Sequence, residues 1–424
     1  MSLPRLLLGA DADAMGLLRH LQVHGEIARE GRRGRARDCA GLLAELGRSG
    51  LRGRGGGAFP LAAKIAAVAR ARRAGVLVAN GAEGEPMSVK DRMLLESLPH
   101  LVLDGVMELA GVLGAAEIVI AIDEHSGEAI DAVAAALDER PDADRGASRP
   151  RIVAVPAGYV SGQETAIVNF LNAGAALPTS QPPRIAQRGV GRRPTLMANV
   201  ETLAHVALIA RHGAEWFREL GPGDEPGSAL VTFSGAIGDP GVYEIELGSH
   251  LGALVDGAGG LTEPARAFLF GGYAGAWVDG AAARQARLSD ASLRKVGASL
   301  GSGVIVALGQ SACPVAEVTR VAGWMARESS GQCGPCVNGL GSIARAMADV
   351  RAGSARRDAL ADIRRWAQLA SGRGACAHPD GTARFVLSAL RVFGPEFDDH
   401  VRHGPCDACQ GQVLIAPGRE RALA

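Results

Sequence analysis

The feature that most constrains the fold is an alternation of short β-branched runs with stretches of helical spacing, between residues 51 and 212. The runs at 76–80, 117–123 and 151–155 have the length and composition of buried strands. The intervening stretches at 60–73, 99–114 and 126–140 predict helices, and Ser126 is a candidate N-cap for the last of them. This order predicts a mostly parallel α/β sheet whose ligand sites lie beyond the carboxyl ends of its strands.

The rest of the chain divides by its sequence pattern. Residues 1–50 are rich in Arg and Ala and are expected to be helical. The segment GPGDEPG at 221–227 ends the α/β domain at about 226, and 227–280 predicts a small α+β module with strands at 230–234, 242–247 and 267–270. We expect 281–312 to be a linker. Helical spacing near 314–329, 337–351, 355–371 and 379–393 predicts a helical bundle over 313–424.

The balance of charge does not favour nucleic acid or anionic lipid as a partner, because Lys+Arg and Asp+Glu both number 45 and the net charge is zero.

No membrane helix or secretory signal is predicted. The most apolar stretch, 101–122, is interrupted by three acidic residues and does not predict a membrane helix. Asp11 and Asp13 follow the short N-terminal Leu run, so no secretory signal is predicted. We expect a cytoplasmic protein that reaches a membrane only through partner subunits.

The cysteines favour metal ligation over a disulfide framework, because they are odd in number and crowd late in the chain in CxxC pairs. They stand at positions 39, 313, 333, 336, 376, 406 and 409. We interpret the isolated Cys39 and Cys313 as buried small apolar residues. Only three lysines occur, and Lys64 and Lys90 both fall in motifs where a compact positive charge is useful.

A glycine-rich loop, GRGGGAFP from Gly53 to Pro60, leads into the helix expected at 60–73, with Lys64 in its first turns. Glycines let a backbone approach a ligand closely, and free N–H groups at a helix start bind phosphate. The loop is not a Walker motif, because no Lys-Ser/Thr pair follows its last glycine. The pattern is equally consistent with a phosphate cradle and with a structural turn.

Three further polar segments fall at strand ends or helix starts. They are NGAEGEP at 80–86 followed by KDR at 90–92, YVSGQET at 159–165, and Asn199-Val-Glu-Thr after Pro194-Thr195. Each by itself is consistent with an ordinary loop and helix cap. The chain has only five asparagines and three tyrosines, so the placing of Asn80, Asn199 and Tyr159 in these segments favours a binding site.

A separate metal site is indicated by SGQCGPC at 330–336 with Cys376 forty residues after Cys336. Thiolates in a CxxC turn that contains Gly and Pro can face one centre, and a distant third thiolate can approach it. The spacing does not distinguish an iron–sulfur cluster from zinc.

Taken together and in this order, the segments resemble the FMN- and NADH-binding flavoprotein subunit of respiratory complex I, a family also found in soluble NAD-linked hydrogenases and formate dehydrogenases. They are GLRGRGGGAFPLAAKI from Gly50, ANGAEGEPMSVKDR from Ala79, YVSGQETAI from Tyr159, ANVET from Ala198 and ESSGQCGPCVNG from Glu328. The resemblance covers about residues 50–395. It implies a Rossmann-like α/β FMN domain at 51–226, a ubiquitin-like β-grasp module of the soluble-ligand-binding type (SLBB) at 227–280, and a helical bundle that carries a 4Fe–4S cluster.

The resemblance also implies site residues, position by position. The expected contacts of the FMN phosphate and ribityl chain are Gly53, Arg54, Gly55, Gly56, Lys64, Asn80 and Asn199. The expected surroundings of the isoalloxazine ring are Glu83, Tyr159, Gly162 and Glu164. Glu85 corresponds to a carboxylate on the nicotinamide side, so Glu85 and Glu164 are the expected catalytic residues, and Phe59 corresponds to an aromatic that packs on adenine.

Several positions depart from the family pattern. Ala82, Gln163 and Ala198 replace polar or acidic residues beside the flavin, while Ala67 and Arg184 replace adenine-stacking aromatics and Gln181 replaces a Lys near the dinucleotide. Base–aromatic stacking contributes about 1–3 kcal/mol per ring, so we expect weak NADH binding. Arg184 could instead favour the 2′-phosphate of NADPH.

The cluster motif lacks one ligand, because Ser330 stands at its first cysteine. Cys333, Cys336 and Cys376 are three thiolates, whereas a 4Fe–4S cluster takes four. We expect Cys406 or Cys409 to complete the site. The alternatives are Ser330 as a ligand, an open iron, and a tail CxxC that binds zinc or nothing.

The resemblance therefore predicts an NAD(P)H dehydrogenase-type oxidoreductase, which passes electrons through FMN to a 4Fe–4S cluster and a ferredoxin-like or complex I-like redox partner. One alternative keeps both cofactors but exchanges electrons with a ferredoxin or redox complex without using NADH. Another is a non-catalytic, zinc-stabilised subunit.

Overall fold

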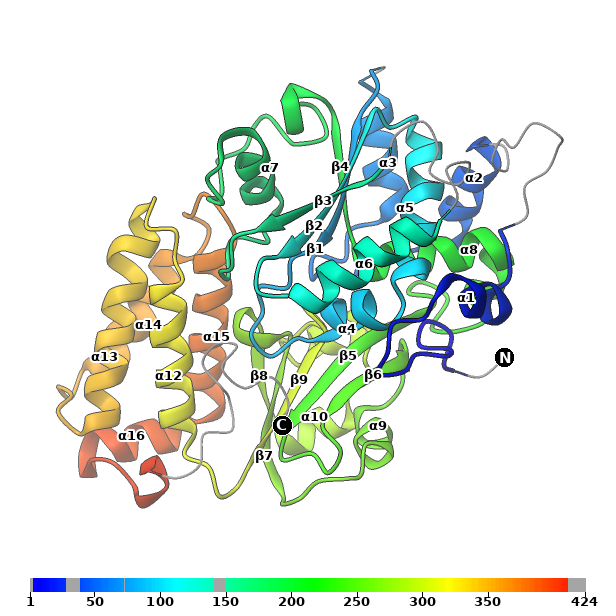
Figure 1. Ribbon diagram of the computed structural model, residues 1–424. Coiled ribbons are helices and arrows are strands. Elements are labelled where there is room, and N and C mark those ends of the chain that lie inside the picture. The colour runs from blue at the N-terminus through cyan, green and yellow to red at the C-terminus, as the bar shows by residue number, and fades with distance from the viewer. Residues whose placement is uncertain (1–2, 28–38, 72, 141–148, 411–424) are drawn as a thin grey trace, which may run out of the picture. The chain divides into compact units, whose positions relative to one another are not determined.

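The structure, a computed structural model, describes residues 3–27, 39–71, 73–140 and 149–410 (Figure 1). The end of the predicted bundle, 411–424, lies outside the described residues. The chain forms two compact units. The first comprises Met1–Gly84, Val89–Leu230 and Glu244–Leu247, and the second comprises Glu85–Ser88, Val231–Tyr243 and Gly248–Ala424.

A four-stranded parallel sheet in the order β3-β2-β1-β4 forms the centre of the first unit. Its strands are β1 (Val76–Gly81), β2 (Glu117–Asp123), β3 (Arg151–Val155) and β4 (Thr195–Asn199). The three predicted strands are confirmed. The strand β4, which pairs with β1, was not predicted, and the sequence indicated only a loop and a helix cap there. The residues of β4, TLMAN, contain a single β-branched side chain and so give little strand signal.

Helices cover both faces of this sheet, which explains why β1 and β2 are apolar almost throughout. Val76 and Val78 of β1 pack in a buried cluster with Ile167 of α7 (Glu164–Ala173). Leu77 points to the opposite face and is also completely buried. Helices α5 (Pro99–Leu113) and α8 (Val200–Arg218) contact β1.

The remaining helices of the first unit are α1 (Leu17–His24), α2 (Cys39–Ser49), α3 (Leu61–Ala69), α4 (Lys90–Ser97) and α6 (Gly127–Glu139). The helices expected at 60–73, 99–114 and 126–140 are therefore present as α3, α5 and α6. Ser126 is at the N-cap of α6, but its side chain makes no capping hydrogen bond. Cys39 is exposed and donates to the carbonyl of Gly111, so its predicted burial is wrong.

A five-stranded sheet in the order β6-β5-β9-β7-β8 begins the second part of the chain. Its strands are β5 (Ser228–Gly235), β6 (Gly241–Glu246), β7 (Ala265–Phe270), β8 (Ala276–Asp279) and β9 (Val304–Gly309), with α9 (Leu251–Gly257), α10 (Gly280–Gln285) and α11 (Asp290–Lys295) in the connections. The first and last strands, β5 and β9, are parallel neighbours at the centre, as in a β-grasp.

The prediction of a linker at 281–312 is wrong. These residues contain α10, α11 and the completely buried β9, whose run VIVALG fills the middle of the sheet between β5 and β7. A central strand has neighbours on both edges and both faces, so it is apolar and short. The β-grasp module therefore extends to Gly309 rather than ending at residue 280.

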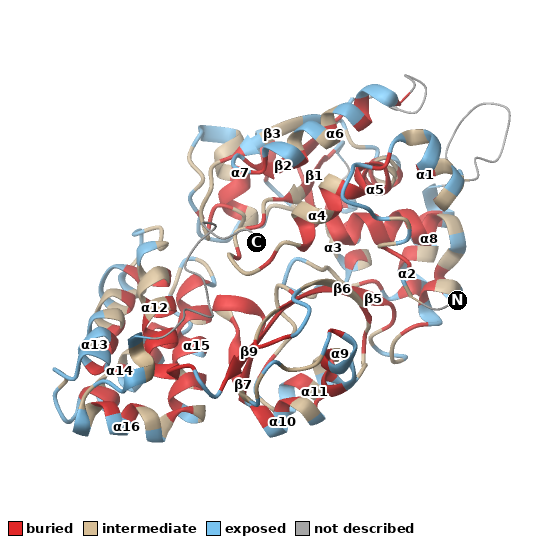
Figure 2. Cartoon of the chain, turned by 60° about the horizontal axis from the view of Figure 1, so that its bottom comes forward, coloured by how far each residue is buried: buried red, intermediate tan, exposed pale blue. Residues whose placement is uncertain are grey.

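The helical bundle consists of α12 (Pro314–Arg327), a π-helix (Pro335–Leu340), α13 (Gly341–Ala352), α14 (Ala359–Ala370), α15 (His378–Val392), α16 (Gly394–His403) and a 3₁₀ turn (Asp407–Gln410). Four of the α-helices were predicted and α16 was not. Figure 2 shows buried residues concentrated on α12 and α15, with more exposed surface on α13 and α14. None of the described helices is long and apolar enough to cross a membrane.

Candidate functional site

The polar motifs meet at the carboxyl edge of the parallel sheet. Asn80 at the end of β1 is in register with Asn199 at the end of β4. The side-chain amide of Asn80 donates to the carbonyl of Gly162, 3.0 Å away, in the loop before α7. Three of the predicted segments therefore lie together at the edge where open α/β sheets bind ligands.

Asn199 joins these segments to α4 and α8. Its Nδ2 donates to Asp91 Oδ2 at 2.6 Å and to the carbonyl of Asn80 at 3.4 Å. Its Oδ1 accepts from the N–H of Glu201 at 3.0 Å and so caps α8. Both asparagines bond to protein groups here, and they hold together the loops at this edge of the sheet.

Glycines allow the same loops to approach one another. A Cβ on Gly162 would lie 2.8 Å from the carbonyl oxygen of Ala82, and one on Gly84 would lie 2.8 Å from that of Tyr159. A Cβ on Gly55 would lie 3.1 Å from the Cβ of Asn199. These separations are closer than Cβ atoms normally approach other atoms, so the motifs favour glycine at these positions.

The glycine-rich loop is closed at its base and exposed at its tip. Gly53 donates to the carbonyl of Phe59 at 2.9 Å, and Pro60 is at the N-cap of α3 rather than at the first helical position. Residues 55–57 are exposed, and among the described residues none accepts a hydrogen bond from their three N–H groups. Exposed backbone donors in a glycine-rich loop fit a phosphate group.

Lys64 and Glu164 form an ion pair at this edge. Their side chains are 30% and 38% exposed, and Lys64 Nζ also lies 3.3 Å from the carbonyl oxygen of Met197 in β4. The two predicted site residues are thus brought together from α3 and the first turn of α7. A partly exposed cation beside the glycine loop suits a phosphate-bearing ligand.

Arg54 differs from the prediction that its side chain contacts phosphate. Its guanidinium is 8% exposed and its Nε lies 4.0 Å from Oε1 of the buried Glu201. Burial lowers the pKa of Arg54, an effect that the Glu201 charge opposes. The backbone N–H of Arg54 donates to Thr202 Oγ1 at 2.9 Å. The Arg54 side chain therefore faces inward and helps to balance a buried carboxylate.

Lys90 is likewise an internal charge rather than a ligand-facing one. Its Nζ lies 2.7 Å from Asp91 Oδ1 and 2.8 Å from Glu201 Oε2, with all three side chains at least nine-tenths buried. Burial alone would lower the pKa of Lys90, but Asp91 and Glu201 raise it above its ordinary value. Glu83 accepts from the N–H groups of Asp91 and Arg92, both at 3.2 Å, at the positive end of α4.

The other predicted contacts are placed as follows. Glu85, in the second unit, is buried and accepts from the N–H of Tyr273 at 2.9 Å. Phe59 is 48% exposed and Tyr159 is half-buried. Gln163, where the resemblance implies an acidic residue, caps α7 by accepting from the N–H groups of Thr165 and Ala166. An amide oxygen can accept such capping hydrogen bonds as a carboxylate oxygen does.

Cys333, Cys336 and Cys376 (the Cys333 group) lie near enough to one another for the thiols of Cys333 and Cys376 to affect the pKa of Cys336. The CxxC opens the π-helix, where Cys333 O accepts from the N–H groups of Cys336 at 3.1 Å and Val337 at 3.0 Å. Burial raises the pKa of Cys336 to about 12, and the neighbouring thiols of Cys333 and Cys376 add to the rise. Single turns of π-helix are frequent at functional sites. Ser330 is half-buried in the preceding loop.

Cys406 and Cys409 are not part of that group. Cys409 Sγ lies 3.7 Å from Cys406 Sγ and 3.2 Å from Cys313 Sγ. Cys313 precedes α12, whereas the Cys333 group follows it, and the 14 residues of α12 span roughly 20 Å. The expectation that Cys406 or Cys409 completes the cluster is therefore corrected. Cys313 is buried as predicted, but its thiol contacts other candidate ligands rather than only apolar neighbours.

The comparisons with known proteins agree with this arrangement. Residues 46–208 match the Nuo51 FMN-binding domain, 230–276 match the SLBB domain, and 316–400 match the NADH-ubiquinone oxidoreductase-F iron-sulfur binding region. The NADH-quinone oxidoreductase F subunit 2 of Rhizobium meliloti (strain 1021) is 33% identical over 371 residues, which are 84% of this chain and 88% of the relative. The chain belongs to the family of NADH-quinone oxidoreductase F subunits.

Other F subunits match over similar lengths. The one from Streptomyces coelicolor is 30% identical over 86% of this chain and 84% of its own, and the one from Escherichia coli (strain K12) is 30% identical over 84% and 83%. The air-oxidized NAD+-reducing [NiFe]-hydrogenase structure superposes with a TM-score of 0.81 at 28% identity, over 89% of this chain. This chain spans 65% of that hydrogenase chain.

Membership of the family of F subunits confirms the predicted resemblance, the α/β, β-grasp and iron–sulfur layout, and the cofactors FMN and 4Fe–4S. The glycine loop and the three grouped thiols fit these two cofactors. The family does not favour the alternatives without NADH or with zinc in place of the cluster. The contacts assigned to single residues stay predictions.

Proposed function

We propose that this chain oxidises NADH at an FMN bound on the carboxyl edge of the parallel sheet, and delivers the electrons to a 4Fe–4S cluster held by Cys333, Cys336 and Cys376. The observation that carries the flavin site is the exposed loop at 55–57, which leads toward α3 and whose N–H groups have no acceptor among the described residues. Family membership supports both cofactors.

The chain's own groups would hold the flavin in place. The loop N–H groups are donors for a phosphate dianion, and Lys64 adds a compact cation that now pairs with Glu164. Asn80, Gly162 and Asn199 keep the three loops in contact and so fix the shape of the crevice. When bound, FMN would supply the exchange between a hydride pair and single electrons.

The donor and the partners follow from the relatives. Proteins named as F subunits of NADH-quinone oxidoreductase and an NAD+-reducing hydrogenase share this fold, so NADH is the proposed donor and further redox subunits are the proposed acceptors. The chain would then be a cytoplasmic protein that meets a membrane through its partner subunits.

A matched pair of glycine variants tests the flavin site. Gly162→Ala places a Cβ 2.8 Å from the carbonyl oxygen of Ala82 and should force the loops apart, whereas a Cβ on Gly111 in α5 meets nothing within 4 Å. After anaerobic purification, we expect the Gly162 variant to lose most of its FMN and the Gly111→Ala variant to keep it. Stopped-flow mixing of wild-type protein with NADH should reduce the flavin. Full FMN in the Gly162 variant, or no flavin reduction by NADH, would refute the proposal.

A further inference from the structure

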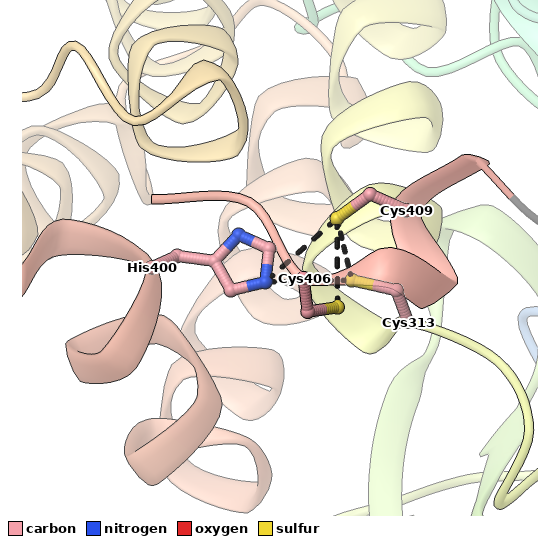
Figure 3. A group of neighbouring side chains, drawn as sticks. All are labelled: Cys313, His400, Cys406 and Cys409. Carbon is pink, nitrogen blue, oxygen red and sulfur yellow. Dashed lines mark hydrogen bonds between the residues drawn. The ribbon is translucent and has the colours of Figure 1, made fainter. Parts of the chain in front are cut away.

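Four side chains at the far end of α12 from the Cys333 group present ligand atoms to one another (Figure 3). They are Cys313, His400, Cys406 and Cys409, and their sulfur and nitrogen atoms all lie within 4.8 Å of one another. Figure 3 shows the imidazole of His400 and the three thiols pointing to a common centre.

Three of the separations are close to those of a tetrahedral metal site. Zn–S bonds of about 2.3 Å and Zn–N bonds of about 2.0 Å place tetrahedral ligand atoms about 3.8 Å (S to S) and about 3.5 Å (S to N) apart. Cys406 Sγ and Cys409 Sγ are 3.7 Å apart, and His400 Nε2 is 3.6 Å from Cys313 Sγ and 3.8 Å from Cys409 Sγ. Cys313 Sγ and Cys409 Sγ, at 3.2 Å, are closer than in such a site and would move apart on metal binding.

Backbone structure holds each ligand in this geometry. Cys313 is the N-cap of α12 and its sulfur accepts from the N–H of Ala316 at 3.4 Å. His400 is in the last turn of α16, and Cys406 and Cys409 flank a turn in which the N–H of Cys409 donates to Cys406 O at 3.0 Å. Cys313 and His400 are buried.

The three thiols of the site lie outside the cofactor-binding regions that match the family, and His400 is at the end of one of them. The iron–sulfur region match begins at residue 316 and ends at 400, so all three thiols lie outside it. The Cys333 group lies beyond the other end of α12. A Cβ on Gly353, after α13, would lie 2.8 Å from Cα of Gly404, which places the chain before Cys406 at the end of α13 remote from the π-helix.

We propose that Cys313, His400, Cys406 and Cys409 bind one zinc ion. Three thiols and one imidazole are a preferred zinc ligand set, and four protein ligands leave no open position, as in structural zinc sites. In a polynuclear iron–sulfur cluster, thiolates bound to different irons lie further apart than thiolates bound to one zinc ion, because at least two metal ions stand between their sulfur atoms. The ion would attach the tail at 404–410 to the start of α12 and the end of α16, across ligands 96 residues apart in the chain.

Metal analysis of the full-length protein, purified without a chelating tag, tests the proposal. We expect about one zinc per chain in addition to the iron of the cluster. The double variant Cys406→Ser with Cys409→Ser should lose the zinc and keep its iron and FMN. Cys39→Ser, which removes an exposed thiol outside the group, should keep all three. Cys376→Ser should show the opposite pattern, with iron lost and zinc kept.

Cobalt provides a second readout that does not depend on the zinc count. Protein produced with cobalt in place of zinc should show the absorption of tetrahedral thiolate-bound Co(II), and the double variant should lack it. Zinc retained in the double variant, loss of iron in place of zinc, iron at this site in the wild type, or a disulfide between Cys313 and Cys409 would each overturn the proposal. None of these outcomes depends on FMN or NADH, so failure here is distinct from failure of the proposed function.

Discussion

The Nζ atom of Lys90 lies 2.8 Å from Oε2 of Glu201, and the two side chains are 3% and 1% exposed. Glu201 also accepts from the N–H of Leu230 at 2.8 Å. This buried pair therefore connects the start of α4, the start of α8 and the beginning of β5 behind the crevice. A lysine that the sequence placed in a motif suited to a compact positive charge thus supports the loops from within.

Removing the Lys90 charge should destabilise the first unit strongly. Lys90→Met removes the only cation paired with the buried Asp91 in the part of the chain that the structure describes and leaves Glu201 with Arg54 alone, and breaking a buried ion pair costs about 3–5 kcal/mol. Urea unfolding should show this loss of unfolding free energy. Lys295→Met removes an exposed lysine and should change the value little. Equal stability of the two variants would contradict the assigned role of the pair.

Lys64 should affect flavin content rather than stability, because its side chain is partly exposed at the crevice. Lys64→Ala removes one charge-assisted contact, worth about 1.5–3 kcal/mol, and should weaken FMN binding by roughly ten- to a hundredfold. FMN released on denaturation measures occupancy. Arg54→Ala should instead lower the unfolding free energy, since Arg54 faces Glu201. A Lys64 variant that purifies with full FMN would show that the cradle does not need this cation.

Aromatic residues restored at Ala67 and Arg184 should tighten NADH binding. Each ring adds about 1–3 kcal/mol of stacking, or roughly five- to a hundredfold in affinity. Stopped-flow titration of flavin reduction gives the affinity of the wild type and of Ala67→Phe with Arg184→Phe. Arg188→Phe, also on an exposed position, is the matched control. Saturation of the wild type by micromolar NADH would contradict the expected weak binding.

Ser330→Cys should strengthen the cluster. The Cys333 group supplies three thiolates, and the structure places Cys406 and Cys409 elsewhere, so a cysteine at 330 would restore the fourth ligand. We expect slower iron loss on exposure to air and a fuller 4Fe–4S EPR signal in the reduced protein. Ser330→Ala is the control of similar size. If Ser330→Cys loses iron as fast as the wild type, residue 330 does not approach the cluster.

The stability of the first unit should fall in mild acid. Burial lowers the pKa of His24 and of His100 from 6.5 to about 4. Between these values the unfolded chain binds protons that the folded chain does not, so stability present above pH 6.5 is lost as the pH falls toward 4. Urea unfolding at several pH values measures the slope.

A histidine pair provides the control for that slope. His100→Gln removes one of the buried titrating groups and should flatten the dependence on pH. His125→Gln alters a side chain that is 65% exposed, so the dependence of unfolding free energy on pH should remain that of the wild type. If the His100 variant shows the same dependence of unfolding free energy on pH as the wild type, groups other than His100 cause the acid sensitivity.

The sequence by itself determined the order of strands and helices from 76 to 155 and the motifs at the strand ends. These depend on local periodicity and on residue spacing, which a chain carries whatever its tertiary contacts. Even so, β4 and β9 were not predicted as strands: β4 has one β-branched residue, and β9 lies in a stretch rich in Gly, Ala and Arg. Their identity depends on the neighbours that pair with them.

Only the tertiary structure decided which charged and sulfur groups meet. Arg54 was predicted to contact the FMN phosphate and Lys90 was noted only as a charge within a motif, yet the structure buries both beside Glu201. The late cysteines looked like spare ligands for the cluster, yet the length of α12 separates them from Cys333 and places them with Cys313 and His400. Contacts between residues 96 positions apart depend on how helices pack, and helical spacing within one segment contains no information about that packing.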